Sequence, residues 1–142
     1  GTCADKPVLA YFNPFTQGIE EHNCDIGWDK DTQEEFYDYT APNAERAVGL
    51  VIPDTAEIVE HEGKKWIKVK AKLWVKYNRQ LIKNLLKAKT RKVSVEIEIL
   101  ESYEDEEGIE VIEKFTFDGV TILQYNIINF YNHFLFKILL IY

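Results

Sequence analysis

Residues 92–100 read Lys-Val-Ser-Val-Glu-Ile-Glu-Ile-Leu, so that polar and apolar side chains alternate. Because successive side chains of a β-strand point to opposite faces, this period of two predicts a strand whose valines and isoleucines face a core. Its other face then carries Ser94, Glu96 and Glu98. A hydroxyl and two carboxylates on one strand face suit a site of proton transfer. The alternative is a merely solvated outer face, which any amphipathic strand has.

The length and composition indicate one globular domain. The chain has 142 residues, of which 46% are hydrophobic and 29% charged, and typical domains contain about 100–150 residues. The apolar run at residues 8–12 is too short for the core of a signal peptide, and no basic residues cluster before it. We therefore expect a cytoplasmic protein.

The cysteines and histidines do not form a recognisable metal motif. Cys3 and Cys24 are not part of a CxxC pair, and the three histidines are scattered at 22, 61 and 133. We predict no metal and no cofactor. A nucleophilic pair of Cys24 with His22 is an alternative, but such pairs are usually assembled across space, so we expect a reduced, free Cys24.

Charge is strongly segregated along the chain. Residues 63–92 carry 12 basic and no acidic side chains, whereas residues 1–62 carry 3 basic and 14 acidic ones. A basic block can follow a phosphate backbone, which raises nucleic acid as a partner. However, Lys68, Lys70 and Lys72 alternate with apolar residues, as in a half-buried strand. We favour pairing of these lysines with Glu96 and Glu98 across a sheet over a nucleic-acid surface.

The order of predicted elements favours a mainly β (α+β) fold. Most segments have strand character, and one helix is expected from an N-cap at Asn78 to near Lys89. Strands are expected at residues 7–12, 47–52, 57–60, 65–76, 92–100 and 109–123, with a long irregular loop at 16–46. Hairpin-rich chains remove exposed edges by closure, so we predict a small closed or nearly closed β-barrel with one or more flanking helices.

The same segments resemble a known family. Residues 65–74, the helix, then 92–97 and 115–123 are similar to the prohead proteases of tailed bacteriophages, which are capsid-maturation serine proteases that share a fold with the herpesvirus assemblins. The resemblance covers roughly residues 44–123. It implies a β-barrel with an active site on its outer wall. It also implies a serine nucleophile in the valine-serine strand, a histidine base earlier in the chain, and a third member that varies among His, Asp and Glu.

Carried onto this chain, the resemblance makes Ser94 the nucleophile. A serine hydroxyl needs an imidazole within hydrogen-bond reach to accept its proton. We favour His22 as this base, because it lies in the irregular segment upstream of the strand at 47–52. His61, beside a predicted turn, is the alternative, and His133 lies in the last segment of the chain.

The third catalytic residue follows from the predicted hairpin. A turn centred at residue 105 places Thr116 opposite Ser94, with Asp118 one step away on the same face. We favour Asp118, because a neighbouring strand leaves room for a ring between acid and hydroxyl. Glu96, on the same strand face as Ser94, is the alternative, and simple surface charge is a further interpretation of both.

These assignments predict a serine endopeptidase of phage capsid maturation. It would cleave scaffold and major capsid protein segments inside the assembling procapsid in the host cytoplasm, with the chain itself as a further candidate substrate. Self-association is a further candidate interaction, and we expect no membrane partner. The first alternative is a catalytically inactive barrel that acts as a capsid-assembly or scaffold partner. The second is a nucleic-acid-binding β-domain that uses the lysine block.

The end of the chain differs in character from the rest. We predict a single protease-like domain at 1–123 and an aberrant hydrophobic tail at 124–142, produced by a frameshift or truncation. The run from Phe134 is too short to cross a bilayer of about 30 Å. A buried helix and an exposed strand are the structural alternatives for it.

Overall fold

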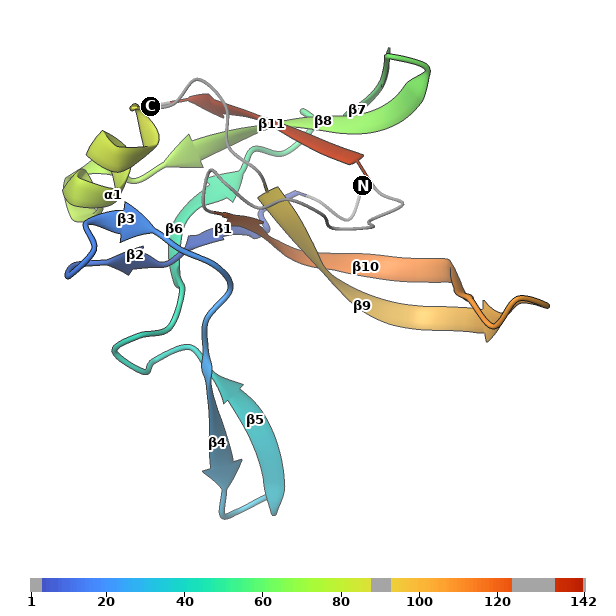
Figure 1. Ribbon diagram of the computed structural model, residues 1–142, viewed down its shortest axis with the longest axis horizontal. Coiled ribbons are helices and arrows are strands. Elements are labelled where there is room, and N and C mark those ends of the chain that lie inside the picture. The colour runs from blue at the N-terminus through green and yellow to red at the C-terminus, as the bar shows by residue number, and fades with distance from the viewer. Residues whose placement is uncertain (1–3, 88–92, 124–134, 142) are drawn as a thin grey trace.

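The computed structural model describes residues 4–87, 93–123 and 135–141, the last of these through its backbone (Figure 1). Its elements are β1 (Pro7–Ala10), β2 (Phe12–Asn13), β3 (Gly18–Ile19), β4 (Asp25–Asp29), β5 (Glu34–Asp38), β6 (Arg46–Val51), β7 (Glu57–His61), β8 (Lys64–Leu73), a 3₁₀ turn (Val75–Tyr77), α1 (Arg79–Leu85), β9 (Val93–Glu104), β10 (Glu110–Ile122) and β11 (Leu135–Ile141). The predicted mainly β fold is confirmed.

Seven strands form one mixed sheet. Its order is β11-β8-β6-β1-β10-β9, and β7 pairs with β8 beside this path. The pairs β1–β10 and β8–β11 are parallel, and the other pairs are antiparallel. Two small sheets, β2–β3 and β4–β5, complete the described strands.

The predicted closed barrel is not found among the described residues. The path of the main sheet ends at β9 on one side and β11 on the other, without pairing between them. We had expected closure to protect the sheet edges. In β9 the edge is instead protected by charged side chains at Glu98, Glu101 and Glu104. The distal parts of β9 and β10 extend from the sheet as an exposed hairpin (Figure 1).

The lysine-rich strand β8 lies between β11 and β6 in the main sheet and also pairs with β7. Val69, Ala71 and Leu73 are buried, as their alternation with lysines predicts. The predicted partners of these lysines were wrong, because β6, β1 and β10 separate β8 from β9. Lys68 instead forms an ion pair with Glu57, which faces it across the β7–β8 hairpin. Local pairing therefore neutralises this lysine.

The predicted helix is present but shorter. It begins after Asn78, as expected, but the Asn78 side chain donates a hydrogen bond to the Trp74 carbonyl at 2.9 Å and makes no cap to the helix. Leu81, Ile82 and Leu85 are buried against the core, as their helical spacing predicts. Helical residues end at Leu85, and Lys89 lies outside the described residues.

The core lies between the sheet and this helix. Its buried members come from β1, β3, β6, β8, α1 and β10: Val8, Ala10, Ile19, Val48, Val51, Val69, Ala71, Leu73, Leu81, Ile82, Leu85, Phe117, Val120 and Ile122. Gly49 allows β6 and β8 to approach, because a Cβ there would collide with the Lys72 carbonyl oxygen. This core fixes β6 and β10, the two strands that flank β1.

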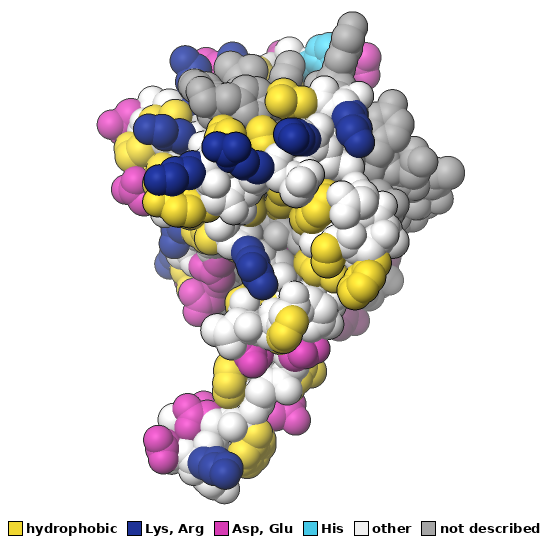
Figure 2. Space-filling view, turned by 90° about the vertical axis from the view of Figure 1, so that its left-hand side faces the viewer, with side chains coloured by type: hydrophobic (Ala, Val, Ile, Leu, Met, Phe, Trp, Pro, Cys, Tyr) yellow, Lys and Arg dark blue, Asp and Glu magenta, His cyan; other side chains and the backbone are white. Residues whose placement is uncertain are grey.

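The segment 16–46, predicted as a loop, contains β3, β4, β5 and the first residue of β6. The β4–β5 hairpin projects from the main sheet as an arm (Figure 1). Figure 2 shows basic side chains gathered on the body, whereas the narrow projection carries mainly acidic and hydrophobic ones. The strands of this arm lack a buried face, which is why no period of two revealed them.

The predicted aberrant tail contributes a strand. β11 pairs in parallel with β8 from Leu135↔Trp66 to Ile141↔Lys72. Of the two structural alternatives for the run from Phe134, the strand is the one found, and residues 124–134 and 142 lie outside the described part. No helix in the described residues has the length and apolar character needed to cross a membrane.

Candidate functional site

His22 lies at the base of the β4–β5 arm, where the backbone is clamped on both sides. The Glu20 amide donates to the Tyr11 carbonyl at 3.0 Å, and the Glu45 amide donates to the Asn23 carbonyl at 2.7 Å. The second bond joins the segment that enters the arm to the segment that leaves it. It therefore places His22 next to Glu45, although 22 residues separate them in the sequence.

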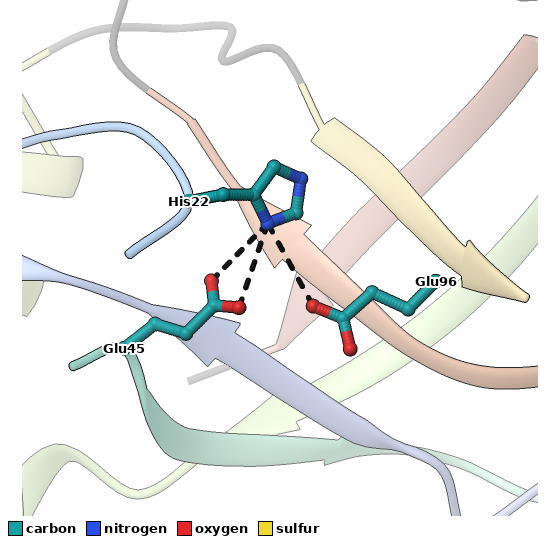
Figure 3. Close-up of side chains that lie close together, drawn as sticks. All are labelled: His22, Glu45 and Glu96. Carbon is teal, nitrogen blue, oxygen red and sulfur yellow. Dashed lines mark hydrogen bonds and ion pairs between the residues drawn. The ribbon is translucent and has the colours of Figure 1, made fainter. Parts of the chain in front are cut away.

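The imidazole of His22 meets two carboxylates at the same nitrogen. Its Nδ1 lies 3.5 Å from Oε1 and 3.4 Å from Oε2 of Glu45. It also lies 3.7 Å from Oε1 of Glu96, on β9 (Figure 3). Both acids approach Nδ1, so Nε2 lies on the other edge of the ring, away from them. The side chain of His22 is 42% exposed.

His22, Glu45 and Glu96 form a cluster whose inner side, at Glu45, is buried. Glu45 is only 2% exposed and Thr121, on β10, is 0% exposed. The Thr121 hydroxyl donates to Oε1 of Glu96 at 3.0 Å. Oε2 of Glu45 is buried without a hydrogen-bond partner among the described residues. Burial of a carboxylate oxygen without a hydrogen bond destabilises the folded state. A proton or a cation bound to this oxygen would offset that cost.

Burial and the second carboxylate shift the protonation of Glu96. Desolvation raises the pKa of Glu96 to about 7, and the hydrogen bond and negative charge of Glu45 add to the increase. The hydrogen bond with Glu45 raises the pKa of His22, although burial opposes this. Glu96 therefore exchanges its proton near neutral pH, beside an imidazole whose own pKa is raised.

Ser94 lies on the same strand face as Glu96, two residues away, and is half-buried. It pairs with Thr121, not with Thr116 as predicted, and Thr116 faces Glu98. The predicted register was wrong because the turn is formed by residues 105–108, later than assumed, and β10 contains bulges. Within the described residues, no hydrogen bond joins Ser94 to a histidine.

Asp118 sits in the bulge of β10 between Phe117 and Gly119. It lines an open cavity of about 580 Å³ together with His22, Cys24, Tyr39 and Glu96, among others. Its carboxylate forms no hydrogen bond or ion pair with His22 in the described part of the chain. The structure thus places Asp118 near the imidazole but gives the contacts at Nδ1 to the two glutamates.

Sequence reasoning missed Glu45. It is a single acid ahead of a buried strand, in a segment without periodicity. The hydrogen bond from the Glu45 amide to the Asn23 carbonyl joins its segment to that of His22, and no local sequence pattern encodes this bond. Glu96 was found, as the alternative to Asp118, because the period of two placed it on the face of Ser94.

The other candidates lie elsewhere or are poorly activated. His61 is at the end of β7, with its side chain 68% exposed beside Glu62 and Trp66. Cys24 is free, and burial together with nearby acids raises the pKa of its thiol. A thiol held protonated is a weak nucleophile, so its surroundings do not favour a Cys24–His22 pair.

Comparison with known proteins gives one family. A model described as the YonD N-terminal domain matches residues 1–129, which includes every side chain of the cluster. The match spans nearly all of the chain and extends beyond residue 123. No curated protein and no solved structure matches the chain.

Proposed function

We propose that this chain, which belongs to the YonD N-terminal domain family, is a serine endopeptidase with Ser94 as nucleophile and His22 as general base. One observation carries the proposal. The clamped loop brings the imidazole of His22 to Glu96, on the polar face of β9 that also carries Ser94. The residues to which the resemblance assigns the roles of nucleophile and base, 72 positions apart, thus share one region of the fold.

The contacts at Nδ1 define the roles of the two glutamates. A carboxylate that accepts from Nδ1–H holds the imidazole in the tautomer whose Nε2 lone pair is free to accept a proton. Glu45 and Glu96 both lie on that side of the ring. We assign them, rather than Asp118, to orient His22 and to stabilise its protonated form.

The proposed reaction is acyl transfer. The Ser94 hydroxyl attacks the substrate carbonyl while Nε2 of His22 takes its proton, and the imidazolium then protonates the leaving amine. Water hydrolyses the acyl-enzyme by the reverse proton transfers. Ser94 has to come within hydrogen-bond reach of Nε2 when substrate binds. In free enzymes such bonds are often long and tighten only in the complex.

The resemblance to phage prohead proteases supplies the biological setting of the proposal. It suggests scaffold and major capsid protein segments as substrates, the assembling procapsid in the host cytoplasm as the location, and an assemblin-like sheet as the framework. The cavity lined by His22, Tyr39, Glu96 and Asp118 opens beside the cluster, where a peptide could approach.

A fluorophosphonate probe tests the nucleophile. The folded chain should be labelled once, and Ser94→Ala should abolish labelling. Ser102→Ala is the matched control, because Ser102 lies on the same strand and its exposed hydroxyl donates to Glu110. Its labelling should equal that of the wild type.

Two results would overturn the proposal. The first is a wild-type chain that stays unlabelled, also when mixed with capsid and scaffold proteins, which would favour the catalytically inactive assembly partner. The second is labelling that persists in Ser94→Ala. Circular dichroism of each variant checks that the chain is folded.

A further inference from the structure

We propose that His22, Glu45 and Glu96 form a binding site for a divalent transition-metal cation, of which Zn²⁺ is the best match. Three ligand atoms, one from each residue, lie within 4.8 Å of one another. They come from three separate parts of the chain: the loop before β4, the residue before β6, and β9. This explains why sequence spacing gave no sign of a metal site.

The distances suit a single small cation. Zn²⁺ binds imidazole nitrogen and carboxylate oxygen at about 2.0–2.2 Å, so two neighbouring ligands of a tetrahedral ion lie about 3.3–3.5 Å apart. Nδ1 of His22 is 3.4 Å from Oε2 of Glu45 and 3.7 Å from Oε1 of Glu96. These separations lie at the long end of hydrogen bonding, and they are also close to those between two ligands of one ion.

The buried oxygen of Glu45 points independently to a cation. Glu45 is 2% exposed, and its Oε2 has no hydrogen bond in the described part of the chain. Figure 3 shows its carboxylate directed at the imidazole and toward Glu96. A bound dication would compensate the charge of both carboxylates and occupy this oxygen, for which the described residues supply no hydrogen bond.

The donor set and the open side narrow the choice of metal. One imidazole and two carboxylates suit Zn²⁺ better than Mg²⁺, which prefers six oxygen ligands and keeps its water. The cluster borders the open cavity, and His22 is 42% exposed, so water can complete the coordination from that side. Thr121 donates to Glu96 and would hold this ligand in place from the buried side.

Metal binding at this position would regulate the proposed peptidase, and this consequence rests on the proposed function. Coordination through Nδ1 uses its lone pair, so the ring proton moves to Nε2. Nε2 is the atom that must accept the proton of Ser94. The metal-bound chain would therefore be inactive, and removal of the cation would restore the base.

Calorimetric titration with ZnCl₂ tests the site without reference to activity. We expect one Zn²⁺ per chain and competition by Mg²⁺ only at far higher concentration. Glu45→Gln should weaken binding by more than the roughly 10–100-fold typical of losing an outer-shell partner. Glu96→Gln, at a less buried position, gives a second variant should Glu45→Gln fail to fold.

Two control variants test whether neighbouring side chains, and not the proposed three, bind the metal. Glu98→Gln changes an exposed carboxylate on the same face of β9, and Cys24→Ser removes the nearby thiol. Both should bind Zn²⁺ like the wild type. Absence of binding, or binding that survives both Glu45→Gln and Glu96→Gln, would overturn the site, as would binding lost in Cys24→Ser alone.

Fluorophosphonate labelling with Zn²⁺ and then with excess EDTA tests the regulatory consequence. Labelling should be blocked at Zn²⁺ concentrations that saturate the calorimetric site and should return with EDTA. A chain that binds Zn²⁺ but is never labelled refutes the peptidase and leaves the metal site standing. A chain that is labelled equally with and without saturating Zn²⁺ refutes the regulation.

Discussion

The β4–β5 arm and the base from which it projects belong to one continuous segment, yet they have opposite character. In the arm, Ile26, Trp28 and Tyr37 are 66%, 55% and 69% exposed. At the base, Glu45 is 2% exposed and lies against His22. Apolar side chains are thus in solvent, and a carboxylate is buried. The backbone bond between Asn23 and Glu45 marks the boundary between them.

This difference shows what holds the candidate site together. The arm is a two-stranded sheet, and such hairpins alone are marginally stable in water. The base is instead attached to the main sheet through Glu45, which precedes β6, and through Glu96 on β9. We therefore expect the base to keep its geometry whatever happens to the arm.

The largest expected effect is on the base. His22→Ala should slow fluorophosphonate labelling by about 10³-fold or more, because the proposed general base is lost. His61→Ala is the matched control, since that imidazole is exposed at the end of β7. The labelling rates of the two variants are compared in reactions that are quenched at successive times. Equal rates in both variants would remove His22 from the mechanism.

A medium effect is expected in the pH dependence of stability. The folded pKa of Glu96 is raised to about 7 from 4.5, so the folded chain binds more protons than the unfolded one between these values. The stabilisation of the folded state that results from this difference is fully present below pH 4.5 and is lost as the pH rises through 7. The free energy of unfolding should fall by on the order of 1–2 kcal/mol between pH 5 and 8, after allowance for partial exposure.

Denaturant titrations with EDTA measure this fall. Glu96→Gln, which has no carboxyl group to ionise, should flatten the pH profile, whereas Glu98→Gln on the same strand face should keep the wild-type slope. His22, whose pKa is also raised, acts in the same direction and remains in both variants. A wild-type profile unchanged by Glu96→Gln would contradict the buried carboxyl pair.

The smallest effect is expected in the arm. Trp28→Ala should change the free energy of unfolding by no more than about 0.5 kcal/mol, because the side chain is 55% exposed and outside the core. Val48→Ala, in β6, should cost several times more, since this side chain is 1% exposed. A large cost at Trp28 would mean that the arm packs against the body.

The sequence predicted those features that depend on local periodicity. The alternation in residues 65–73 and 92–100 gave β8 and β9, and the spacing of Leu81, Ile82 and Leu85 gave the helix. The fold class followed from the order of these elements. The lack of a buried face hid the arm, and the late turn and bulges of β10 shifted the register that should have placed Asp118.

The site could be predicted only in part. Glu96, now seen beside His22, could be named because it lies on a strand whose pattern is visible. Ser94 and Asp118, on or beside such strands, stay predictions. His22 was favoured for its position in the segment upstream of β6. Glu45 could not be found, because it meets His22 through a contact between segments that no sequence pattern connects. The open sheet was missed because charged side chains, not closure, protect the edge of β9.

The central claim is that the two carboxylates hold His22 with its proton on Nδ1 and its Nε2 free as a base. Long-range ¹H–¹⁵N correlation spectra of the metal-free chain, recorded above the pKa of His22, measure this tautomer directly. We predict a protonated Nδ1 and an unprotonated Nε2, with the preference weakened in Glu45→Gln. A His22 ring that carries its proton on Nε2 in the metal-free wild type would contradict the account.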